Sequence, residues 1–205
     1  MNLKEEKKWF DALKTELEES YLRHNEPWEQ SGFFISKDAW VKCRKPIADC
    51  IEASGRFLDI GCANGYLLQC LLEWTGEKGI EIIPYGLDLS ERLIDSAKKR
   101  LPEYKGNLYI GNGWNWASPT KFDYVRTEIA YVPESLQKPY IERIISLYLK
   151  AGGKLLLAEY RSRKDDPEKP WVDETLKSWG LKVAKKVSGF YDNKELTRVA
   201  VLAKQ

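Results

Sequence analysis

The sequence contains little histidine, little methionine and no excess of either charge. Its 205 residues include one histidine, one methionine and four cysteines, and the net charge is +2. The cysteines form no C-x-x-C pair, so the chain offers no recognisable zinc site and we predict no metal. The near-neutral charge provides no global field for binding nucleic acid, which disfavours that partner. We interpret the cysteines as reduced thiols, which fits a cytoplasmic location.

Long apolar runs are also missing. No run approaches the roughly 18 residues of a membrane span, and the N-terminal stretch MNLKEEKKWF lacks the apolar centre of a signal peptide. Apolar residues still make up 43% of the chain, with eight tryptophans and eleven tyrosines, which excludes a disordered protein. We therefore expect one soluble domain over residues 1–205, with no membrane partner. The oligomeric state is left open.

The first quarter of the chain has a helical pattern. Apolar spacing predicts an amphipathic helix over residues 3–22, followed by an aromatic loop at 23–36. Ser36 is a suitable cap for a second helix that reaches about residue 53, with a kink expected at Pro46. We predict an N-terminal helical extension over residues 1–53.

From residue 54 onward, strand patterns alternate with helix patterns. Strands are predicted over 56–60, 85–89, 107–111, 122–127, 152–160, 181–187 and 196–203. Helices are predicted over 64–74 and 90–100, within 134–149, and around 171–179. Alternation of this kind favours a doubly wound, mostly parallel α/β sheet, and the two successive strands at the end predict an antiparallel edge hairpin. The expected core is a seven-stranded sheet in residues 54–205.

The most informative segment is residues 57–68, FLDIGCANGYLL, where a buried strand runs into a loop with two glycines. In open α/β sheets, ligands lie beyond the carboxyl ends of the strands, so this loop is the expected site. The P-loop pattern G-x-x-x-x-G-K-[ST] is absent. A dinucleotide motif would need a third glycine at position 66, where Tyr66 stands, which disfavours a nicotinamide-dependent oxidoreductase.

The remaining pattern is Asp59-x-Gly61-x-Ala63-x-Gly65, which resembles the first motif of class I S-adenosylmethionine-dependent methyltransferases. The resemblance extends over about residues 50–203, because the later strands follow in the family's order and spacing. It implies S-adenosylmethionine as the cofactor, with backbone amides of the loop near its carboxylate and Asp59 near its ammonium. It also implies that Asp88, at the end of the second predicted strand, holds the ribose hydroxyls. The competing interpretation of Asp88 is a turn or helix-cap aspartate.

After the third predicted strand, the resemblance places Asn112 at the adenine amino group and Trp114 against the adenine ring. The cofactor-binding residues that the resemblance implies are Asp59, Gly61, Cys62, Ala63, Gly65, Asp88, Leu89, Asn112, Gly113, Trp114 and Thr127.

Candidates for the catalytic step lie after the fourth predicted strand, in VRTEIAYVP. Glu128 and Tyr131 face the expected position of the methyl group, and Glu128 can orient or deprotonate an acceptor. The competing interpretation of Glu128 is a solvated carboxylate or a partner of Arg126. His24 is a third candidate, if its loop closes over the cofactor, and a bystander otherwise.

The acceptor itself is not named by the sequence. DNA amino-methyltransferases of this fold carry Asn/Asp-Pro-Pro-Tyr/Phe after the fourth strand, and this chain has RTEIAYVP there. We therefore expect a small-molecule acceptor methylated on O, N or S. The aromatic residues that could form a lid over it are Trp28, Phe33, Phe34 and Trp40, and the competing interpretation is that they pack the N-terminal extension onto the sheet. The alternatives left open are an RNA or protein methyltransferase, the nicotinamide-dependent oxidoreductase, and a cofactor-binding protein without transferase activity.

Overall fold

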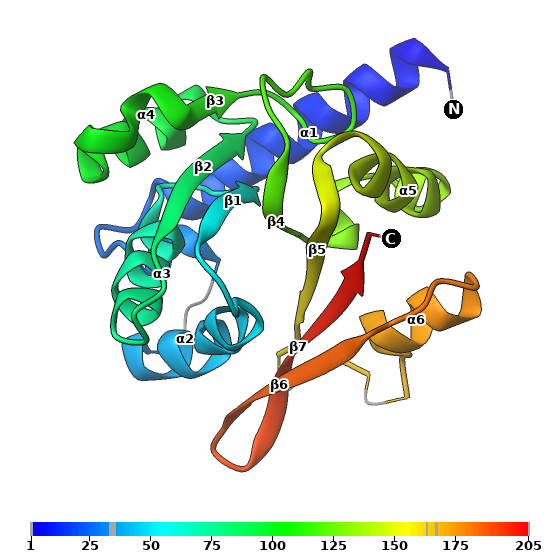
Figure 1. The fold of residues 1–205 in the computed structure, drawn as a ribbon. Helices are drawn as coiled ribbons and strands as arrows, with labels where there is room; N and C mark the ends of the chain where they lie inside the picture. Colours follow the sequence, from blue (N-terminus) through cyan, green and yellow to red (C-terminus); the bar gives the residue numbers. More distant parts are fainter. Residues whose placement is uncertain (1, 33–35, 163, 167, 205) are drawn as a thin grey trace.

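The structure is a computed structural model that describes residues 2–32, 36–162, 164–166 and 168–204. Its centre is a seven-stranded sheet in the order β3-β2-β1-β4-β5-β7-β6 (Figure 1). The strands are β1 Gly55–Ile60, β2 Ile82–Asp88, β3 Leu108–Ile110, β4 Phe122–Thr127, β5 Leu149–Tyr160, β6 Lys185–Tyr191 and β7 Lys194–Ala203. The pairs among β1 to β5 are parallel, and β7 pairs antiparallel with β5 and β6. The predicted fold, with its antiparallel C-terminal hairpin, is confirmed.

Six α-helices are found in the described residues. They are α1 Leu3–Tyr21, α2 Lys37–Arg44, α3 Tyr66–Gly76, α4 Glu91–Arg100, α5 Gln137–Leu147 and α6 Val172–Ser178. The Ser36 side chain accepts from the backbone N–H of Ala39 and so caps α2, as predicted. At Pro46 the chain continues as a 3₁₀ helix over Lys45–Cys50, which is the interruption that proline was expected to cause.

Two apolar cores lie on the two faces of the sheet. The adjacent residues Phe57 and Leu58 of β1 are both fully buried, one in each core, because successive side chains of a strand point to opposite faces. Helices α2, α3 and α4 contribute to the first core, and α5 and α6 to the second. The strand ends between these two layers are therefore held rigidly.

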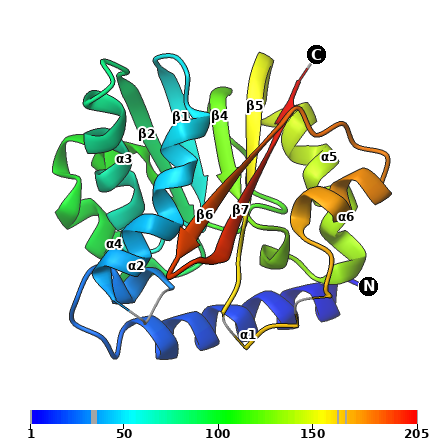
Figure 2. The same ribbon diagram turned by 90° about the horizontal axis from the view of Figure 1, so that it is seen from below.

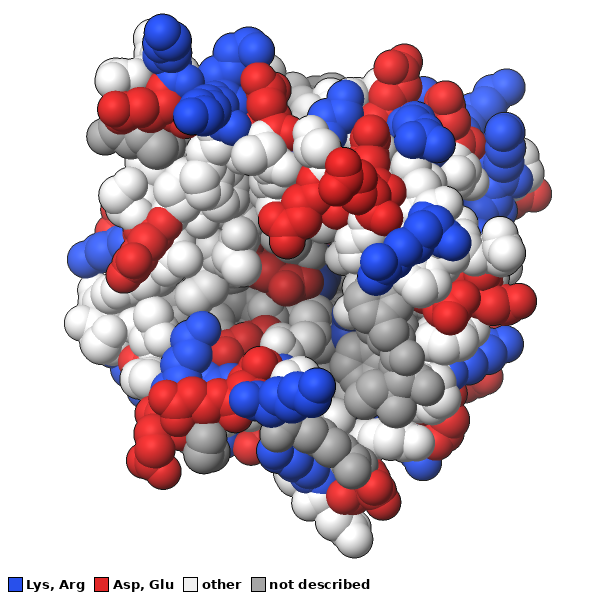
Figure 3. All heavy atoms as spheres, turned by 180° about the vertical axis from the view of Figure 1, so that it is seen from behind, with Lys and Arg blue, Asp and Glu red and all other residues white. Residues whose placement is uncertain are grey.

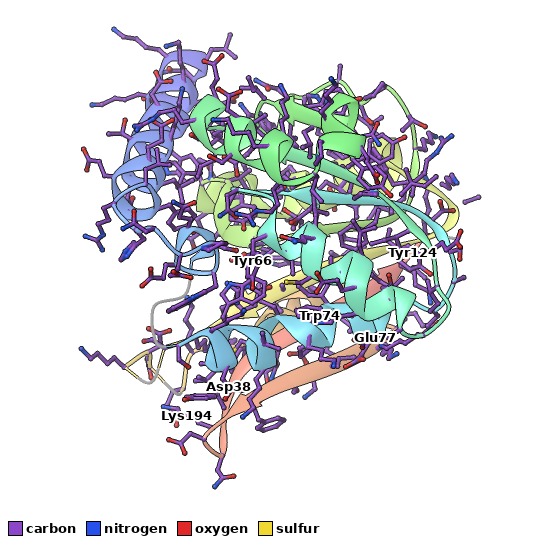
Figure 4. All side chains as sticks on the ribbon, turned by 90° about the vertical axis from the view of Figure 1, so that its left-hand side faces the viewer. Asp38, Tyr66, Trp74, Glu77, Tyr124 and Lys194 are labelled. Carbon is purple, nitrogen blue, oxygen red and sulfur yellow. The ribbon has the colours of Figure 1, made fainter. Side chains whose placement is uncertain are left out.

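Tyr66 packs the N-terminal extension onto the core. Its ring lies 4.7 Å from that of Trp40 on α2, and the Trp74 ring lies 6.2 Å from Trp40 (Figure 4). A large aromatic side chain at position 66 thus fills the space between α3 and α2, where a dinucleotide motif would need glycine.

The C-terminal hairpin differs from its prediction. The segment 188–191, predicted as loop, continues β6, and the turn is confined to Asp192 and Asn193, with φ of 54° and 60°. Gly189 made the segment look like a loop. Its missing side chain instead permits close packing, because a Cβ there would lie 3.0 Å from the Lys42 carbonyl oxygen.

Helix α1 crosses the end of the sheet at which β5 finishes (Figure 2). It is amphipathic, with Phe10 buried in the second core, and Asn2 caps it through a capping box with Glu5. No helix among the described residues is both long enough and apolar enough to cross a membrane.

Candidate active site

The glycine loop, residues 61–65, adopts a left-handed backbone at every second position. Gly61, Ala63 and Gly65 have φ of 78°, 47° and 74°. Ala63 therefore takes a conformation that favours glycine, which explains why a residue with no more than a Cβ stands there. The backbone N–H groups of Gly61 and Cys62 donate to the Leu87 carbonyl at 2.7 and 3.2 Å and fasten the loop to β2.

Asp88 ends β2 beneath this loop. Its Oδ2 accepts from the backbone N–H of Ala63 at 2.8 Å, and its Oδ1 accepts from the N–H of Ser90 at 2.9 Å. Burial raises the pKa of this carboxyl, although the backbone donors oppose the shift. Asp88 is therefore a turn residue, one of its two interpretations. Each carboxylate oxygen has a second lone pair, so the geometry also leaves capacity for the ribose hydroxyls, and that role stays a prediction.

A buried arginine connects the ends of three neighbouring strands. Arg126 of β4 donates from Nη1 to Asp59 Oδ1 at 3.1 Å and to the Tyr131 hydroxyl at 3.2 Å. Its Nη2 donates to Glu128 Oε1, and to the Tyr160 hydroxyl at 3.2 Å. Tyr131 in turn donates to Glu128 Oε1 at 2.7 Å. Glu128 is therefore a partner of Arg126, which was one of its two interpretations.

The titration of this network follows from its burial. Desolvation raises the pKa of Asp59 to about 7, although Arg126 opposes the shift. Burial also raises the pKa of the Tyr131 and Tyr160 hydroxyls, which therefore stay protonated at neutral pH.

Three cavities surround the network. The loop cavity, of about 230 Å³, is lined by Leu17, Tyr21, Ser31, Gly32, Arg44, Asp59, Gly61, Cys62, Ala63, Leu67, Asp88, Arg126, Glu128, Tyr131 and Tyr160. The β3 cavity, of about 30 Å³, is lined by Leu13, Leu17, Ile60, Gly61, Leu87, Asp88, Leu89, Gly111, Asn112, Gly113 and Tyr131. They share Leu17, Gly61, Asp88 and Tyr131. The Tyr131 ring rests on Gly61, where a Cβ would come within 2.6 Å of its Cζ, so it lies between the two cavities.

The β5 cavity, of about 490 Å³, lies on the other side of Glu128 and Tyr160. It is lined by Glu128, Ile129, Ala130, Glu134, Gln137, Ala158, Glu159, Tyr160, Arg161, Asp165, Lys169, Pro170 and Thr175. Two of its charged residues already have structural partners. Glu159 pairs with Arg161 at 2.8 Å and accepts from the Val172 N–H at the start of α6. Figure 3 shows a face of the molecule hollowed at its centre, with acidic side chains gathered at the hollow.

The structure brings most of the predicted residues together. Those that line the loop cavity or the β3 cavity are Asp59, Gly61, Cys62, Ala63, Asp88, Leu89, Asn112, Gly113, Glu128 and Tyr131. Asn112 also forms a turn, since its Oδ1 accepts from the N–H groups of Trp114 and Asn115. Whether each of these residues contacts the cofactor stays a prediction.

Four predicted residues lie elsewhere. Gly65 begins α3, where a Cβ would be 3.0 Å from the Ala97 Cβ, and the Thr127 hydroxyl bonds to that of Tyr140 at 2.7 Å. Trp114 packs against the second core. His24 lies 3.7 Å from Glu29 in the loop after α1. Their proposed roles in binding or catalysis stay predictions.

The residues predicted to form a lid do not lie together in the structure. Trp28 packs against the first core and Trp40 is fully buried in it, so Trp40 is not part of a lid. Phe33 and Phe34 lie outside the described residues. Leu13, Leu17 and Tyr21 of α1 line the cavities instead. Their spacing of four predicts only a helix with one apolar face, so the sequence held no signal for this role. The same is true of Arg44 and Tyr160, which come from α2 and β5.

The residues present fit the cofactor that the family resemblance implies. Asp59 Oδ2 is buried and lacks a hydrogen-bond partner among the described residues, which suits the cofactor's ammonium. Gly61 and Gly113 both lack the Cβ that close neighbours would exclude, namely the Tyr131 ring at Gly61 and the Tyr140 hydroxyl at Gly113.

Comparisons with known proteins agree with this fit. The model of a family described as a methyltransferase domain matches residues 51–204. No curated protein gives a significant match to the sequence.

Several solved structures share the fold. Magnesium protoporphyrin IX methyltransferase from Synechocystis, with bound S-adenosylmethionine, is 17% identical with a TM-score of 0.66, covering 96% of this chain and 97% of its own. The 1,6-didemethyltoxoflavin N1-methyltransferase of Burkholderia thailandensis is 15% identical with a TM-score of 0.68, covering 98% of this chain and 90% of its own. A TehB-like methyltransferase from Corynebacterium glutamicum is 19% identical with a TM-score of 0.57, covering 96% and 98%.

Proposed function

Because this chain belongs to the S-adenosylmethionine-dependent methyltransferases, we propose that it methylates a small polar molecule bound in the β5 cavity. The observation that carries the proposal is the position of this cavity. It meets the loop cavity at Glu128 and Tyr160, so an acceptor there lies next to the predicted methionine end of the cofactor. Its volume of about 490 Å³ is in the range of small-molecule sites.

The walls of the β5 cavity favour a polar acceptor. They carry Glu134, Gln137 and Lys169 in addition to the Glu159–Arg161 pair. A flat apolar molecule would leave these groups without water or a partner, whereas a polar molecule can bond to them.

The solved structures support a small-molecule acceptor. The Synechocystis enzyme is named for magnesium protoporphyrin IX, and the Burkholderia enzyme was solved with 1,6-didemethyltoxoflavin bound. At 17% and 15% identity, these two structures support a class of acceptor that this fold accommodates, and they do not support a particular compound.

The cofactor, when bound, supplies a methyl group on a sulfonium, and its transfer is an in-line displacement that requires alignment and exclusion of water. In this chain, Tyr21 and Leu17 of α1 line the loop cavity, where they would exclude water from the bound cofactor. Glu128 lies in the wall shared by both cavities, where its carboxylate can orient the acceptor or take the proton that the product loses. Tyr131 holds that carboxylate in place through its 2.7 Å hydrogen bond.

The proposal is tested with a cofactor that carries a labelled methyl group. The purified protein is incubated with it and with fractionated cell extract, and label is followed into the small-molecule, RNA and protein fractions. We expect label in the small-molecule fraction only, and loss of labelling in Glu128→Gln at unchanged affinity for S-adenosylhomocysteine. Label in the RNA or protein fraction would overturn the proposal.

A further inference from the structure

The Tyr160 hydroxyl is held in the wall between the loop cavity and the β5 cavity. Tyr160 ends β5, is half-buried and lines both cavities. Its oxygen accepts from Arg126 Nη2 at 3.2 Å, and the guanidinium carbon of Arg44 lies 3.4 Å from the centroid of its ring. These two contacts fix both the plane of the ring and the position of the oxygen.

The hydrogen of this hydroxyl has no acceptor among the described residues. Arg126 is a donor, so it uses a lone pair of the Tyr160 oxygen and leaves the O–H able to donate. Burial raises the pKa of Tyr160, so the hydrogen is present at neutral pH. An enclosed hydroxyl without an acceptor costs free energy, which a ligand atom with a lone pair would recover.

Glu128 presents the complementary group beside Tyr160. Its Oε1 accepts from Arg126 Nη2 and from the Tyr131 hydroxyl, whereas its Oε2 accepts no hydrogen bond within the described part of the chain. Glu128 and Tyr160 are bonded to the same Arg126 nitrogen, so the Tyr160 O–H and the Glu128 Oε2 lie close together. The wall shared by both cavities thus offers one donor and one acceptor, which we call the wall pair.

Most other polar side chains of the β5 cavity are already paired or are solvated. Glu159 and Arg161 bond to each other at 2.8 Å. Glu134, Asp165 and Lys169 are exposed, so water can solvate them whether or not a ligand is bound. Selection among small molecules therefore depends most on the wall pair, which a bound molecule would cut off from water.

We propose that the wall pair selects an acceptor in which an N–H or O–H stands next to an atom with a free lone pair, as in a lactam. Tyr160 donates to the lone pair, and Glu128 Oε2 accepts from the N–H or O–H, which is the group that is methylated. A carboxylate is disfavoured, because it has no hydrogen for Glu128 and carries a charge of the same sign. The inference rests on the proposed function, since it names the class of small molecule that the β5 cavity takes.

Atoms and charge balance in this transfer. The nitrogen or oxygen of the acceptor forms a bond to the methyl carbon, while the bond from that carbon to sulfur breaks and its electron pair stays on sulfur. Glu128 Oε2 takes the proton that the acceptor loses. The positive charge on sulfur and the negative charge on Glu128 therefore disappear together.

The test uses three bicyclic probes on the full chain saturated with S-adenosylhomocysteine. Oxindole has an N–H beside a carbonyl, indole has the N–H without the carbonyl, and 1-methyloxindole has the carbonyl without the N–H. Affinities are measured by ligand-observed NMR titration, which is suited to weak binding. We expect oxindole to bind at least about tenfold more tightly than the other two, because each of these leaves one member of the wall pair without a partner.

Tyr160→Phe should remove only the preference for the carbonyl. Oxindole should then bind about as weakly as indole, while the affinities for indole and for S-adenosylhomocysteine change less than about threefold. Tyr109→Phe is the matched control. It also removes one hydroxyl from a half-buried ring, which packs 5.3 Å from that of Trp116, and Tyr109 is not among the lining residues of the three cavities. It should leave every affinity unchanged.

Equal affinities for the three probes, absent binding included, would overturn the proposal, and this comparison in the wild type does not depend on the folding of a variant. A loss of S-adenosylhomocysteine affinity of tenfold or more in Tyr160→Phe would overturn it too, because the hydroxyl would then serve the cofactor. The proposed function fails separately, if methyl label enters RNA or protein. Label in small molecules together with equal probe affinities would refute the wall pair alone.

Discussion

Asp59 and Arg126 face each other across neighbouring strands and form an ion pair inside the protein. They are partners in the parallel register of β1 and β4, their side chains are 1% and 3% exposed, and Nη1 lies 3.1 Å from Oδ1. The same guanidinium also bonds to Glu128. One cation therefore compensates two carboxylates at the point where the loop cavity meets the β5 cavity.

Removing the Arg126 guanidinium should lower the free energy of unfolding. Arg126→Met leaves Asp59 and Glu128 together without their shared partner, and breaking a buried pair from one side typically costs about 3–5 kcal/mol. We expect a loss of that order in the free energy of unfolding, measured by urea titration at about pH 8, above the pKa of Asp59. Lys150→Met is the control, because Lys150 pairs with Asp123 at 41% and 31% exposure and should contribute less than about 1 kcal/mol. Equal losses in the two variants would show that Arg126 is not needed to compensate the acids.

Asp59 should make the protein less stable as the pH rises, which is the opposite of the usual effect of an aspartate. Its pKa in the folded protein is raised to about 7, against about 3.9 in an unfolded chain. The folded state therefore holds the proton more tightly, so the contribution of this group is complete below about pH 4 and is lost as the pH rises towards about 7. Relative to Asp59→Asn, the wild type should lose stability across that window and no further above it. If the wild type instead gains stability relative to Asp59→Asn as the pH rises from about 4 to about 7, the raised pKa of Asp59 is contradicted.

The same group should couple cofactor binding to proton release. An ammonium placed against Asp59 favours its ionised form, so binding should lower its pKa and expel a proton at pH values below about 7. We expect affinity for S-adenosylhomocysteine to rise with pH up to about 7 in the wild type and to be flat there in Asp59→Asn. Calorimetry in two buffers of different ionisation enthalpy measures the number of protons that are released when the ligand binds. A count of zero in the wild type at about pH 6 would place the ammonium elsewhere.

Asp88 should carry affinity for the ribose. Losing a hydrogen bond to a charged group costs about 1.5–3 kcal/mol, so Asp88→Ala should weaken binding of S-adenosylhomocysteine about tenfold to a hundredfold. The structure adds that this variant also loses the Ala63 and Ser90 contacts, and its stability must be measured beside its affinity. Asp95→Ala, an exposed change on α4, is the control. If Asp88→Ala binds as tightly as the wild type, the ribose assignment is wrong.

The sheet was predictable because its strands carry strong local patterns. β4 is the clearest case: FDYVRT spans the observed strand without error, since both its faces are buried and its ends meet polar residues. The hairpin was misplaced because Gly189 looks like a turn when its neighbours are unknown. Only the folded molecule shows the Lys42 carbonyl that lies close enough to favour a glycine there.

The residues that line the loop cavity beside the strand ends were predictable for a different reason. Asp59, Gly61 and Asp88 lie in short motifs beside strand ends, and strand ends converge in any parallel sheet. Arg44 and Tyr160 lie more than a hundred residues apart, and their stacking depends on how α2 packs against β5. No periodicity or motif marks such a pair, so this part of the site required the structure.

The N-terminal helix should act as the cover of the site. Leu17 and Tyr21 line the loop cavity, and Glu18 is fastened to the core by a 2.6 Å hydrogen bond from the Ser90 hydroxyl at the start of α4. The rest of the extension is not a cover, because Trp40 and Ile47 are fully buried in the first core. A cut before Ser36 therefore removes the helix that lines the site, together with the core contacts of Phe10 and Trp28, and keeps Trp40 and Ile47.

A chain that starts at Ser36 should stay folded, bind S-adenosylhomocysteine more weakly, and lose turnover, because water then reaches the loop cavity. Glu18→Ala in the full chain is the milder change. It should speed dissociation of S-adenosylhomocysteine in stopped-flow measurements while Glu19→Ala, its exposed neighbour, leaves dissociation unchanged. The two variants differ in one hydrogen bond to the core, so equal dissociation rates would remove Glu18 as the fastening. A shortened chain that is molten by near-UV circular dichroism would mean that α1 supports the core through Phe10 and is not a separable cover.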